Sequence, residues 1–298
     1  MREKFFIDVY NYARKNPKTF ILTADLGYKL FDNFEKNLKN QFFNVGASEQ
    51  NMICLAAGLA SMNAKVFVYS IGNFPSLRCL EFIRNCVCYN NLDVNIVSNG
   101  SGFSYGSLGF THHSIEDIAA IRSLPNISIY NPSNSHELNQ NLKEILKFKT
   151  PKYIRLGKFH NLNENFKNQS STIKPGILLI TTGQILEEAI KLKAIIKNEQ
   201  ISIYSVSKIK KISNKDKKNI LNLIKISKKI YTLEENRSQG GFGSIILENF
   251  FQHLKNKEFC IIGVEDCFKK KIGDQKFMRK LYNLDHLSIA QLIKRSLK

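Results

Sequence analysis

The chain has 298 residues, enough for two domains with separate hydrophobic cores. Hydrophobic residues make up 43% of it, which is typical of a soluble globular protein, and no apolar run approaches the roughly 20 residues of a membrane span. The net charge of +19 raises the possibility of nucleic-acid binding, but the lysine runs 208–211 and 269–271 lack the interleaved aromatic residues of such surfaces. We therefore expect a solvated basic surface, with neither a nucleic acid nor a membrane as partner.

The cysteines show no CxxC spacing, and several fall in apolar helical stretches, which is typical of reduced, buried thiols. They are Cys54, Cys79, Cys86, Cys88, Cys260 and Cys267. The first residues, Met1-Arg2-Glu3-Lys4, do not begin a signal-peptide hydrophobic region. These features predict a cytoplasmic protein.

The first 160 residues alternate strand and helix signals. Expected helices cover 2–15, 49–62, 77–89, 116–124 (capped by Ser114) and 137–148, and expected strands cover 20–23, 42–45, 65–69, 94–97, 127–130 and 153–155. This order predicts a mainly parallel sheet covered on both faces, which binds its ligands beyond the carboxyl ends of its strands. Asp25, the turn 46–49, residues 71–74 and the glycine-rich loop 100–109 all follow strands, so we expect them to line one crevice.

Residues 161–175 are polar and without periodicity, and we interpret them as a linker between domains 1–160 and 176–298. In the second domain we expect strands at 178–181, 203–206, 229–233 and 259–263, and helices at 186–196, near 217–226, after Ser244 and at 288–296. The Gly240–Ser244 turn lacks the full GxGxxG pattern, so a tight strand-to-helix turn is expected rather than a phosphate cradle.

The most informative segment is Gly46–Ala60. Ser48 suits the N-cap position, and Glu49 opens an apolar helix that carries no further charge before Lys65. An acid in the first helical turn is favoured by the helix dipole. The helix pattern predicts burial on most sides, however, and a buried carboxylate needs a partner or a raised pKa.

This segment resembles the Ser-Glu-Gln-Asn/His-Met helix of transketolases, and further motifs follow in that family's order. They are Thr23-Ala24-Asp25-Leu26, Ser70–Phe74, Ile83-Arg84-Asn85, Thr111–Asp117, Leu124-Pro125-Asn126, Leu178–Gly183, Glu234-Glu235 and Gly240–Ser244. The resemblance implies an α/β fold with two doubly wound domains, a pyrimidine-binding domain followed by a transketolase C-terminal domain. The family's Gly-Asp-Gly…Asn signature, which holds diphosphate and Mg²⁺, is absent. The chain therefore resembles the C-terminal subunit of a split transketolase.

The resemblance assigns cofactor-binding roles. Glu49 matches the glutamate that hydrogen-bonds the aminopyrimidine of thiamine diphosphate, favouring the imino tautomer that lets the cofactor's own amino group remove the thiazolium proton. Phe74 matches the residue that stacks on the pyrimidine, and Ile71 matches its apolar neighbour, although both could simply fill the core. Asp25 and Leu26 are expected to reach the cofactor across a subunit interface.

Substrate roles follow in the same way. His112 matches a histidine that hydrogen-bonds substrate oxygens, while a structural histidine or a helical metal site with Glu116 are the alternatives. Arg155 and Arg2 match arginines that bind substrate phosphate, and surface charges are the alternative for both.

Two departures from the family bear on the acceptor. Gly100 and Leu108 stand where sugar-phosphate transketolases carry a histidine and an aspartate that contact donor hydroxyls. The loop is expected to be flexible, with Phe103 and Tyr105 available for stacking, which favours a bulkier acceptor such as a nucleotide-linked keto-sugar of polysaccharide synthesis. The alternative is that the loop has drifted and other residues restore the lost contacts.

The expected function is that of one subunit of a thiamine-diphosphate-dependent transketolase, moving a two-carbon ketol unit from a ketose to an aldehyde or keto-sugar. The expected partner is an N-terminal subunit that carries the Gly-Asp-Gly…Asn site and provides most of the ligands of the Mg²⁺ ion. We expect the two chains to form an α2β2 assembly, and we expect no metal site in this chain. Alternatives are a 1-deoxyxylulose-5-phosphate synthase-like subunit, a 2-oxoacid dehydrogenase E1-β-like subunit and a non-catalytic stabilising partner.

Overall fold

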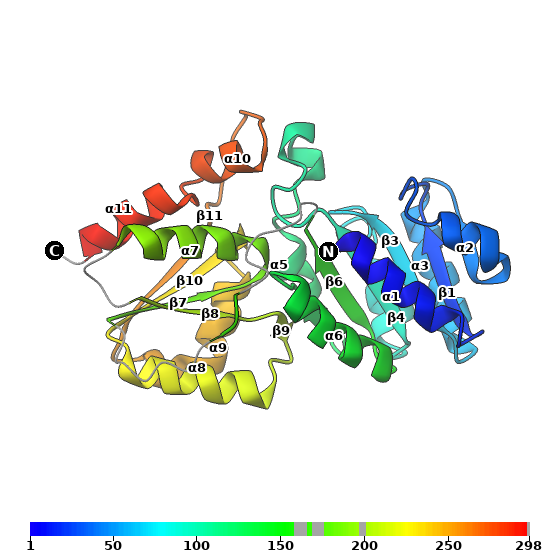
Figure 1. Cartoon of the computed structure of the whole chain (residues 1–298), viewed down its shortest axis with the longest axis horizontal. Coiled ribbons are helices and arrows are strands. Elements are labelled where there is room, and N and C mark those ends of the chain that lie inside the picture. The colour runs from blue at the N-terminus through cyan, green and yellow to red at the C-terminus, as the bar shows by residue number, and fades with distance from the viewer. Residues whose placement is uncertain (158–165, 169–175, 197–200, 297–298) are drawn as a thin grey trace.

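The computed structural model describes residues 1–157, 166–168, 176–196 and 201–296 (Figure 1). Most of the expected linker 161–175 therefore lies outside the described residues. In the described part of the chain, no helix is both long and apolar enough to cross a membrane.

The first sheet has seven strands in the order β2-β1-β3-β4-β6-β5-β9, and all are parallel except β9. Its strands are β1 (Thr19–Thr23), β2 (Phe42–Asn44), β3 (Lys65–Ile71), β4 (Val94–Asn99), β5 (Ser128–Tyr130), β6 (Lys152–Leu156) and β9 (Lys208–Lys210). The main helices of this half are α1 (Arg2–Ala13), α2 (Asp32–Asn37), α3 (Glu49–Ser61), α4 (Leu80–Phe82), α5 (Asp117–Arg122) and α6 (Ser135–Lys147). The mainly parallel α/β fold expected from the alternating pattern is confirmed.

Two separate cores cover the faces of this sheet. On one face, α1 and α6 pack through residues such as Phe5, Phe6 and Leu138, as Figure 1 shows in front of the strands. On the other face, α3 and α5 pack through residues such as Met52 and Ile118. The strands β3 and β4 are accordingly buried almost throughout, as expected for a parallel sheet covered on both sides.

The second sheet has four parallel strands in the order β11-β10-β7-β8. They are β7 (Ile177–Thr181), β8 (Ile201–Ser205), β10 (Lys229–Arg237) and β11 (Glu258–Val264). The helices α7 (Leu186–Ile195), α10 (Gln275–Leu281) and α11 (His286–Ser296) lie on one face, and α8 (Asn214–Ile226) and α9 (Phe242–Leu254) lie on the other (Figure 1). The core under α8 and α9 is continuous with the α3 and α5 core of the first sheet, so apolar packing joins the two halves.

Strand β9 links the two halves through hydrogen bonds. It belongs to the second half of the sequence but pairs antiparallel with β5 at the edge of the first sheet. Lys208 forms an ion pair with Glu144, and Lys210 donates to the carbonyl of Leu124. We expected the lysine run 208–211 to be solvated surface. This expectation is wrong for Lys208 and Lys210, because both side chains are half-buried and bonded to the first domain.

Three local expectations need correction. Helix 77–89 is broken into α4 and a π-helical turn, Ile83–Cys88. Ser114 does not cap α5, whose first flanking residue is Glu116. All six thiols are free, but Cys54 and Cys267 are exposed rather than buried.

Candidate active site

The candidate site lies at the carboxyl ends of the first sheet's strands, where β2 leads into α3 and β3 leads into the segment before α4. Glu49 is the first residue of α3, and Ile71 is the last of β3. Strand order reverses around β1, which lies between β2 and β3. This is the position at which open parallel sheets form their ligand crevices.

Glu49 is a buried carboxylate with two side-chain partners among the described residues. Its side chain is 4% exposed, and Ser70 Oγ lies 3.3 Å from Oε1. The guanidinium of Arg78 donates to Oε2 over 2.8 Å, while the Arg78 side chain itself is 50% exposed. Ser48 occupies the N-cap position as expected, but its side chain makes no capping hydrogen bond. A carboxylate is therefore held at the helix start by one cation that also reaches solvent.

Phe74 connects this carboxylate to His112. The guanidinium carbon of Arg78 lies 4.7 Å from the centre of the Phe74 ring. The His112 ring meets the same phenylalanine edge to face, with centroids 5.2 Å apart at an interplanar angle of 66°. Glu49, Arg78, Phe74 and His112 thus form one continuous group, which we call the Glu49 cluster.

Gly72 allows the two segments of the cluster to approach. Its φ of +46° lies in the left-handed region, and a Cβ there would stand 3.3 Å from the carbonyl oxygen of His112. Its backbone N–H donates to the Asn99 carbonyl over 2.7 Å. The amide of Asn73 donates to the His113 carbonyl. The turn after β3 is therefore fastened to the segment that carries His112.

The other expected cofactor residues lie at the same edge of the sheet. Ile71 is half-buried at the end of β3, and its carbonyl accepts from the Phe74 N–H over 3.0 Å. Asp25 is exposed, with φ of +54°, and its carboxylate accepts from the Asn44 side chain over 3.1 Å. Leu26 follows it and is half-buried. Within the described residues, no hydrogen bond or ion pair joins Asp25 to the Glu49 cluster.

Two arginines, Arg2 and Arg155, were expected to bind substrate phosphate, and their surroundings differ from each other. Arg2 lies beside the phenol groups of Tyr69 and Tyr105, where it opposes the rise in their pKa that burial causes. Arg155 is 3% exposed and donates to Asp117 over 2.8 Å and to the carbonyl of Glu235 over 3.1 Å. Its buried ion pair ties β6 to α5, so we leave Arg155 out of the candidate site.

The glycine-rich loop is firmly packed rather than flexible. Gly102 and Ser114 exchange backbone hydrogen bonds of 3.1 and 3.0 Å. Phe103 is fully buried and stacks on Tyr282 with ring centroids 5.1 Å apart. A Cβ on Gly100 would meet the Tyr105 ring at 2.1 Å. The expectation that Phe103 is available for stacking on a ligand is therefore wrong, and the Tyr105 ring fills the space beside Gly100.

Leu108 and His113 differ in exposure, at the tip of this loop and just after it. Leu108 is 53% exposed, so it remains accessible at the tip. His113 is buried beside the Phe103 ring, and its imidazole lies 3.2 Å from the Gly106 carbonyl. Burial lowers the pKa of His113, which favours the neutral ring.

The Gly240–Ser244 turn is a strand-to-helix turn between β10 and α9, as expected. The backbone N–H groups of Phe242 and Gly243 donate to the buried Glu234 carboxylate over 2.6 and 2.8 Å. Because a side chain of the chain itself takes these donors, the turn does not offer them to a phosphate. Burial raises the pKa of Glu234 to about 8 against the effect of those two donors.

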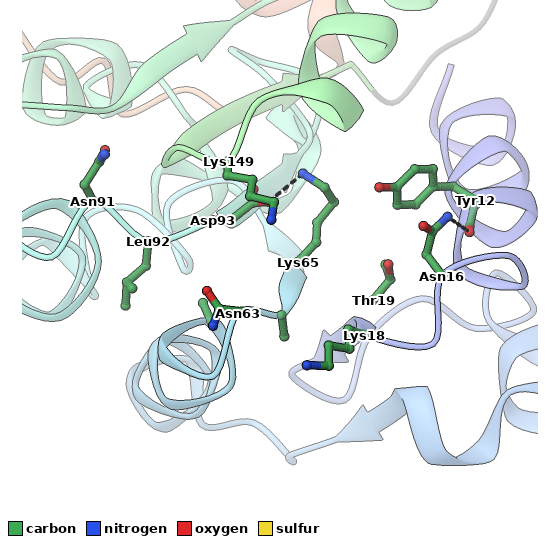
Figure 2. Close-up of a pocket in the computed structure, with 12 residues that line it drawn as sticks. Tyr12, Asn16, Lys18, Thr19, Asn63, Lys65, Asn91, Leu92, Asp93 and Lys149 are labelled. Atoms are coloured by element: carbon green, nitrogen blue, oxygen red, sulfur yellow. Dashed lines mark hydrogen bonds and ion pairs between the residues drawn. The ribbon is translucent and has the colours of Figure 1, made fainter.

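A pocket at the opposite edge of the first sheet is a poorer candidate (Figure 2). It has a volume of about 280 Å³ and lies where β1 and β3 begin, lined by residues that include Tyr12, Lys18, Lys65 and Asp93. The Lys65 ammonium has acceptors for its three protons, namely Asp93 at 2.6 Å and two backbone carbonyls at 3.3 Å. The pocket's buried cation is therefore already satisfied without a ligand.

The metal alternative for His112 and Glu116 receives no support from the geometry. His112 ends a 3-10 turn, Phe110–His112, whereas Glu116 precedes α5, so the two do not share a helix. Glu116 instead pairs with Arg237 at 2.8 Å. Across the described ranges, no group of three or more histidine, cysteine or acidic residues is arranged to hold a metal ion.

Sequence reasoning missed Arg78 and Ser70, the two partners of Glu49. The available signal was a single arginine four residues after Phe74, in a stretch that otherwise lacks charge between Lys65 and Glu81. Only the fold reveals that this arginine faces Glu49, 29 residues earlier in the chain.

Two family models match the chain. The transketolase pyrimidine-binding domain matches residues 5–161, and the transketolase C-terminal domain matches residues 169–275. A putative transketolase C-terminal section from Methanocaldococcus jannaschii is 32% identical over all of this chain and 96% of its own length. One of the subunits of an apulose-4-phosphate transketolase from Actinobacillus succinogenes is 33% identical over 87% of this chain and 86% of its own length.

More distant matches include longer enzymes and solved structures. A 1-deoxy-D-xylulose-5-phosphate synthase from Syntrophus aciditrophicus is 28% identical over 96% of this chain but only 45% of its own length. A split-gene transketolase, described as an inactive beta4 tetramer, has the same fold with a TM-score of 0.83, covering 99% of this chain and 97% of that one at 24% identity. Transketolase from Campylobacter jejuni has a TM-score of 0.78 over 98% of this chain and 46% of its own, at 15% identity.

Proposed function

Because this chain belongs to the transketolase family, with the pyrimidine-binding domain followed by the C-terminal domain, we propose that it is one subunit of a two-chain transketolase. The proposed reaction moves a two-carbon ketol unit from a ketose donor to an aldehyde or ketose acceptor. Thiamine diphosphate, on which the family depends, would supply the electron sink for that transfer. This chain would supply the pyrimidine-binding half of the site.

The Glu49 cluster is the observation that carries the proposal. Glu49 offers a buried carboxylate, and Phe74 offers an aromatic ring face, both at the carboxyl edge of the sheet. A planar, nitrogen-rich group already occupies both, because the Arg78 guanidinium donates to Glu49 and lies over Phe74. The residues present therefore fit an aminopyrimidine ring, which needs the same carboxylate and the same kind of face.

In this proposal Glu49 holds or shares a proton with a pyrimidine nitrogen, and Phe74 orients the ring by stacking. Burial of the carboxylate keeps water from competing for that proton. His112, whose ring meets Phe74 edge to face, would donate to a substrate oxygen. Along the edge of the sheet, the Glu49 carboxylate comes first, the Phe74 ring second and the His112 imidazole third. This order supports a site with the cofactor at the Glu49 end and the substrate at the His112 end.

The exposed face of α3 supports the proposal that a partner chain binds there. One face of this helix is buried against the first sheet, but the face that carries Cys54, Leu55, Gly58 and Met62 is exposed, with Met62 at 65%. A Cβ on Gly58 would meet nothing within 4 Å. The sequence predicted burial on most sides, and an uncharged exposed face that begins beside Glu49 is what a second chain would cover.

The partner would also supply what this chain lacks. The Gly-Asp-Gly…Asn signature for diphosphate and Mg²⁺ is absent from the sequence, and the described residues hold no cluster of acidic, histidine or cysteine side chains suited to a metal. We propose that the partner carries these ligands and that two copies of each chain assemble. Phe110, two residues before His112, is exposed and meets the exposed Phe268 with ring centroids 6.2 Å apart, which adds a second exposed apolar group near the candidate site.

A sugar phosphate is the proposed class of substrate. Two relatives are named for apulose 4-phosphate and one for 6-deoxy-6-sulfo-fructose, which supports small, anionic sugars. Phe103 and Tyr105, the two stacking residues that favoured a nucleotide-linked acceptor, are both buried, and the Tyr105 hydroxyl accepts a hydrogen bond from the Asn99 side chain. Arg2, which lies beside Tyr105 at the same edge of the sheet, is the remaining candidate for the phosphate.

A donor and acceptor screen tests the proposal. The complex of both chains with thiamine diphosphate and Mg²⁺ would be offered either a ketose phosphate or pyruvate as donor, with sugar phosphates and nucleotide-linked keto-sugars as competing acceptors. Ketol transfer from the ketose to a sugar phosphate supports the proposal. If pyruvate were used as a donor and the ketose phosphate were not, the chain would be a 1-deoxyxylulose-5-phosphate synthase-like or dehydrogenase-like subunit. No turnover with either donor would favour a stabilising role.

A further inference from the structure

Arg78 occupies both groups that the proposed cofactor would use. Its guanidinium lies 2.8 Å from the Glu49 carboxylate and 4.7 Å from the centre of the Phe74 ring. A guanidinium is flat and presents N–H donors in its plane and a π face above it. An aminopyrimidine is also flat and has a π face for the same ring, and its ring nitrogen would bind the same carboxyl group through a proton that the two share.

The two side chains of the Arg78–Glu49 ion pair differ in burial. Glu49 is 4% exposed, but the Arg78 side chain is 50% exposed and extends from the segment just before α4. A buried carboxylate is costly without a counter-ion, whereas a half-exposed arginine loses little when it returns to water. Arg78 can therefore leave, while Glu49 stays where α3 begins.

We propose that Arg78 is a placeholder counter-ion, which neutralises Glu49 and covers Phe74 in the cofactor-free chain and is displaced when the pyrimidine ring binds. The inference rests on the proposed function. It makes Arg78 a positioning residue: it keeps the carboxylate and ring in place before loading, and it competes with the cofactor for both.

Because Arg78 competes with the cofactor, replacing Arg78 should tighten the binding of thiamine diphosphate. Arg78→Gln removes the competing cation and leaves Glu49 without its ion pair in the empty site. Both changes favour the loaded state, so the Kd for thiamine diphosphate should fall by about three- to tenfold. Arg78→Lys keeps the charge but loses the flat face, so its Kd should fall less.

Calorimetric titration of thiamine diphosphate with Mg²⁺ into the complex of both chains tests this directly. Arg84→Gln is the matched control, since Arg84 is exposed, lies six residues further along the chain and has a side chain that bonds only its neighbour Asn85 among the described residues. Its Kd should equal that of the unmodified complex. Thermal unfolding adds a second readout: Arg78→Gln should lower the Tm of the cofactor-free complex and enlarge the rise in Tm on loading.

The outcomes separate the inference from the proposed function. An unchanged or higher Kd for Arg78→Gln, or for Arg78→Lys if the glutamine variant does not fold, would overturn the placeholder role. Equal losses of Tm with and without cofactor would also overturn it, because they indicate a purely structural arginine. If the unmodified complex binds no thiamine diphosphate, the proposed function fails instead.

Discussion

The rings of Phe74 and His112 meet edge to face with their centroids 5.2 Å apart, although 37 residues of sequence lie between the two positions. Phe74 follows β3, and His112 follows β4 by way of the glycine-rich loop. The parallel sheet brings both segments to one edge, where the Asn73 side chain also bonds the His113 carbonyl. This junction places the imidazole at the end of the cluster that begins with Glu49.

Glu49 should be essential for turnover but not for folding. In the complex, Glu49→Gln is expected to lower kcat by at least about a hundredfold, because an amide cannot share a proton with the pyrimidine nitrogen. Proton exchange at the thiazolium carbon, measured by NMR in deuterated buffer, should slow in parallel. Glu81→Gln, which changes an exposed acid on α4, is the control, and retention of most activity by Glu49→Gln would refute the assignment.

His112 should act on the substrate rather than on the cofactor. We expect His112→Ala to lower kcat/KM by about ten- to a hundredfold, since a lost hydrogen bond to a charged or developing oxyanion is worth about 1.5–3 kcal/mol. The Kd for thiamine diphosphate should stay within about twofold of the unmodified value. His136→Ala, at an exposed histidine on α6, is the control. A large change in cofactor Kd with normal kcat/KM would assign His112 to the cofactor instead.

Arg155 and Asp117 should matter for stability. Asp117 is fully buried and accepts hydrogen bonds from Arg155, Tyr153 and Asn236. Asp117→Asn leaves the Arg155 cation buried without its counter-charge, so the free energy of unfolding should fall by about 3 kcal/mol. Glu248→Gln, which breaks the surface pair with Arg122, should cost less than about 1 kcal/mol. Equal urea midpoints for the two variants would contradict the buried-pair interpretation.

Glu234 should make stability depend on pH. Burial raises its pKa to about 8 in the folded chain from an ordinary value of 4.5, so the folded state binds this proton more tightly than the unfolded state. Its contribution is full below pH 4.5 and is lost as pH rises toward 8. Between about pH 6 and 9 the loss amounts to about 2–3 kcal/mol.

Glu234→Gln cannot ionise and should escape that loss. The difference in unfolding free energy between the variant and the unmodified chain should therefore shift in the variant's favour between about pH 6 and 9, as measured by urea denaturation. Glu258→Gln, at an exposed acid on β11, provides the control. A difference that stays constant with pH would show that Glu234 is already ionised at the lower end of that range.

The regular elements of the fold could be predicted because each carries its own local pattern. Alternating short apolar runs and amphipathic segments predicted β1, α3, β3, β4 and α6 to within a few residues. Strand β9 could not be predicted, because three residues with two lysines have no strand pattern of their own and are held by pairing with β5. The π-helical turn after α4 likewise depends on tertiary packing rather than on local preference.

Members of the candidate site could be proposed from the sequence where a single residue in a motif matches a role known in the family. Glu49, Phe74 and His112 were each predicted separately, and the fold brings them into one cluster. Arg78 and Arg155 were not predictable in the same way, because an arginine's role depends on which distant acid it meets. Arg155 meets the buried Asp117, and Arg78 meets Glu49. The packed state of Phe103 depends equally on Tyr282, which is far away in sequence.

Cofactor binding by the separate and combined chains tests the central claim most directly. The partner would be an amino-terminal transketolase subunit with the Gly-Asp-Gly…Asn signature, sought first in the neighbouring reading frame. Thiamine diphosphate with Mg²⁺ would be titrated by calorimetry into this chain alone and into the mixture. We predict no micromolar binding by this chain alone and stoichiometric, micromolar or tighter binding by the mixture. Micromolar binding by the isolated chain, or none by the mixture, would contradict the account of a cofactor site shared between two chains.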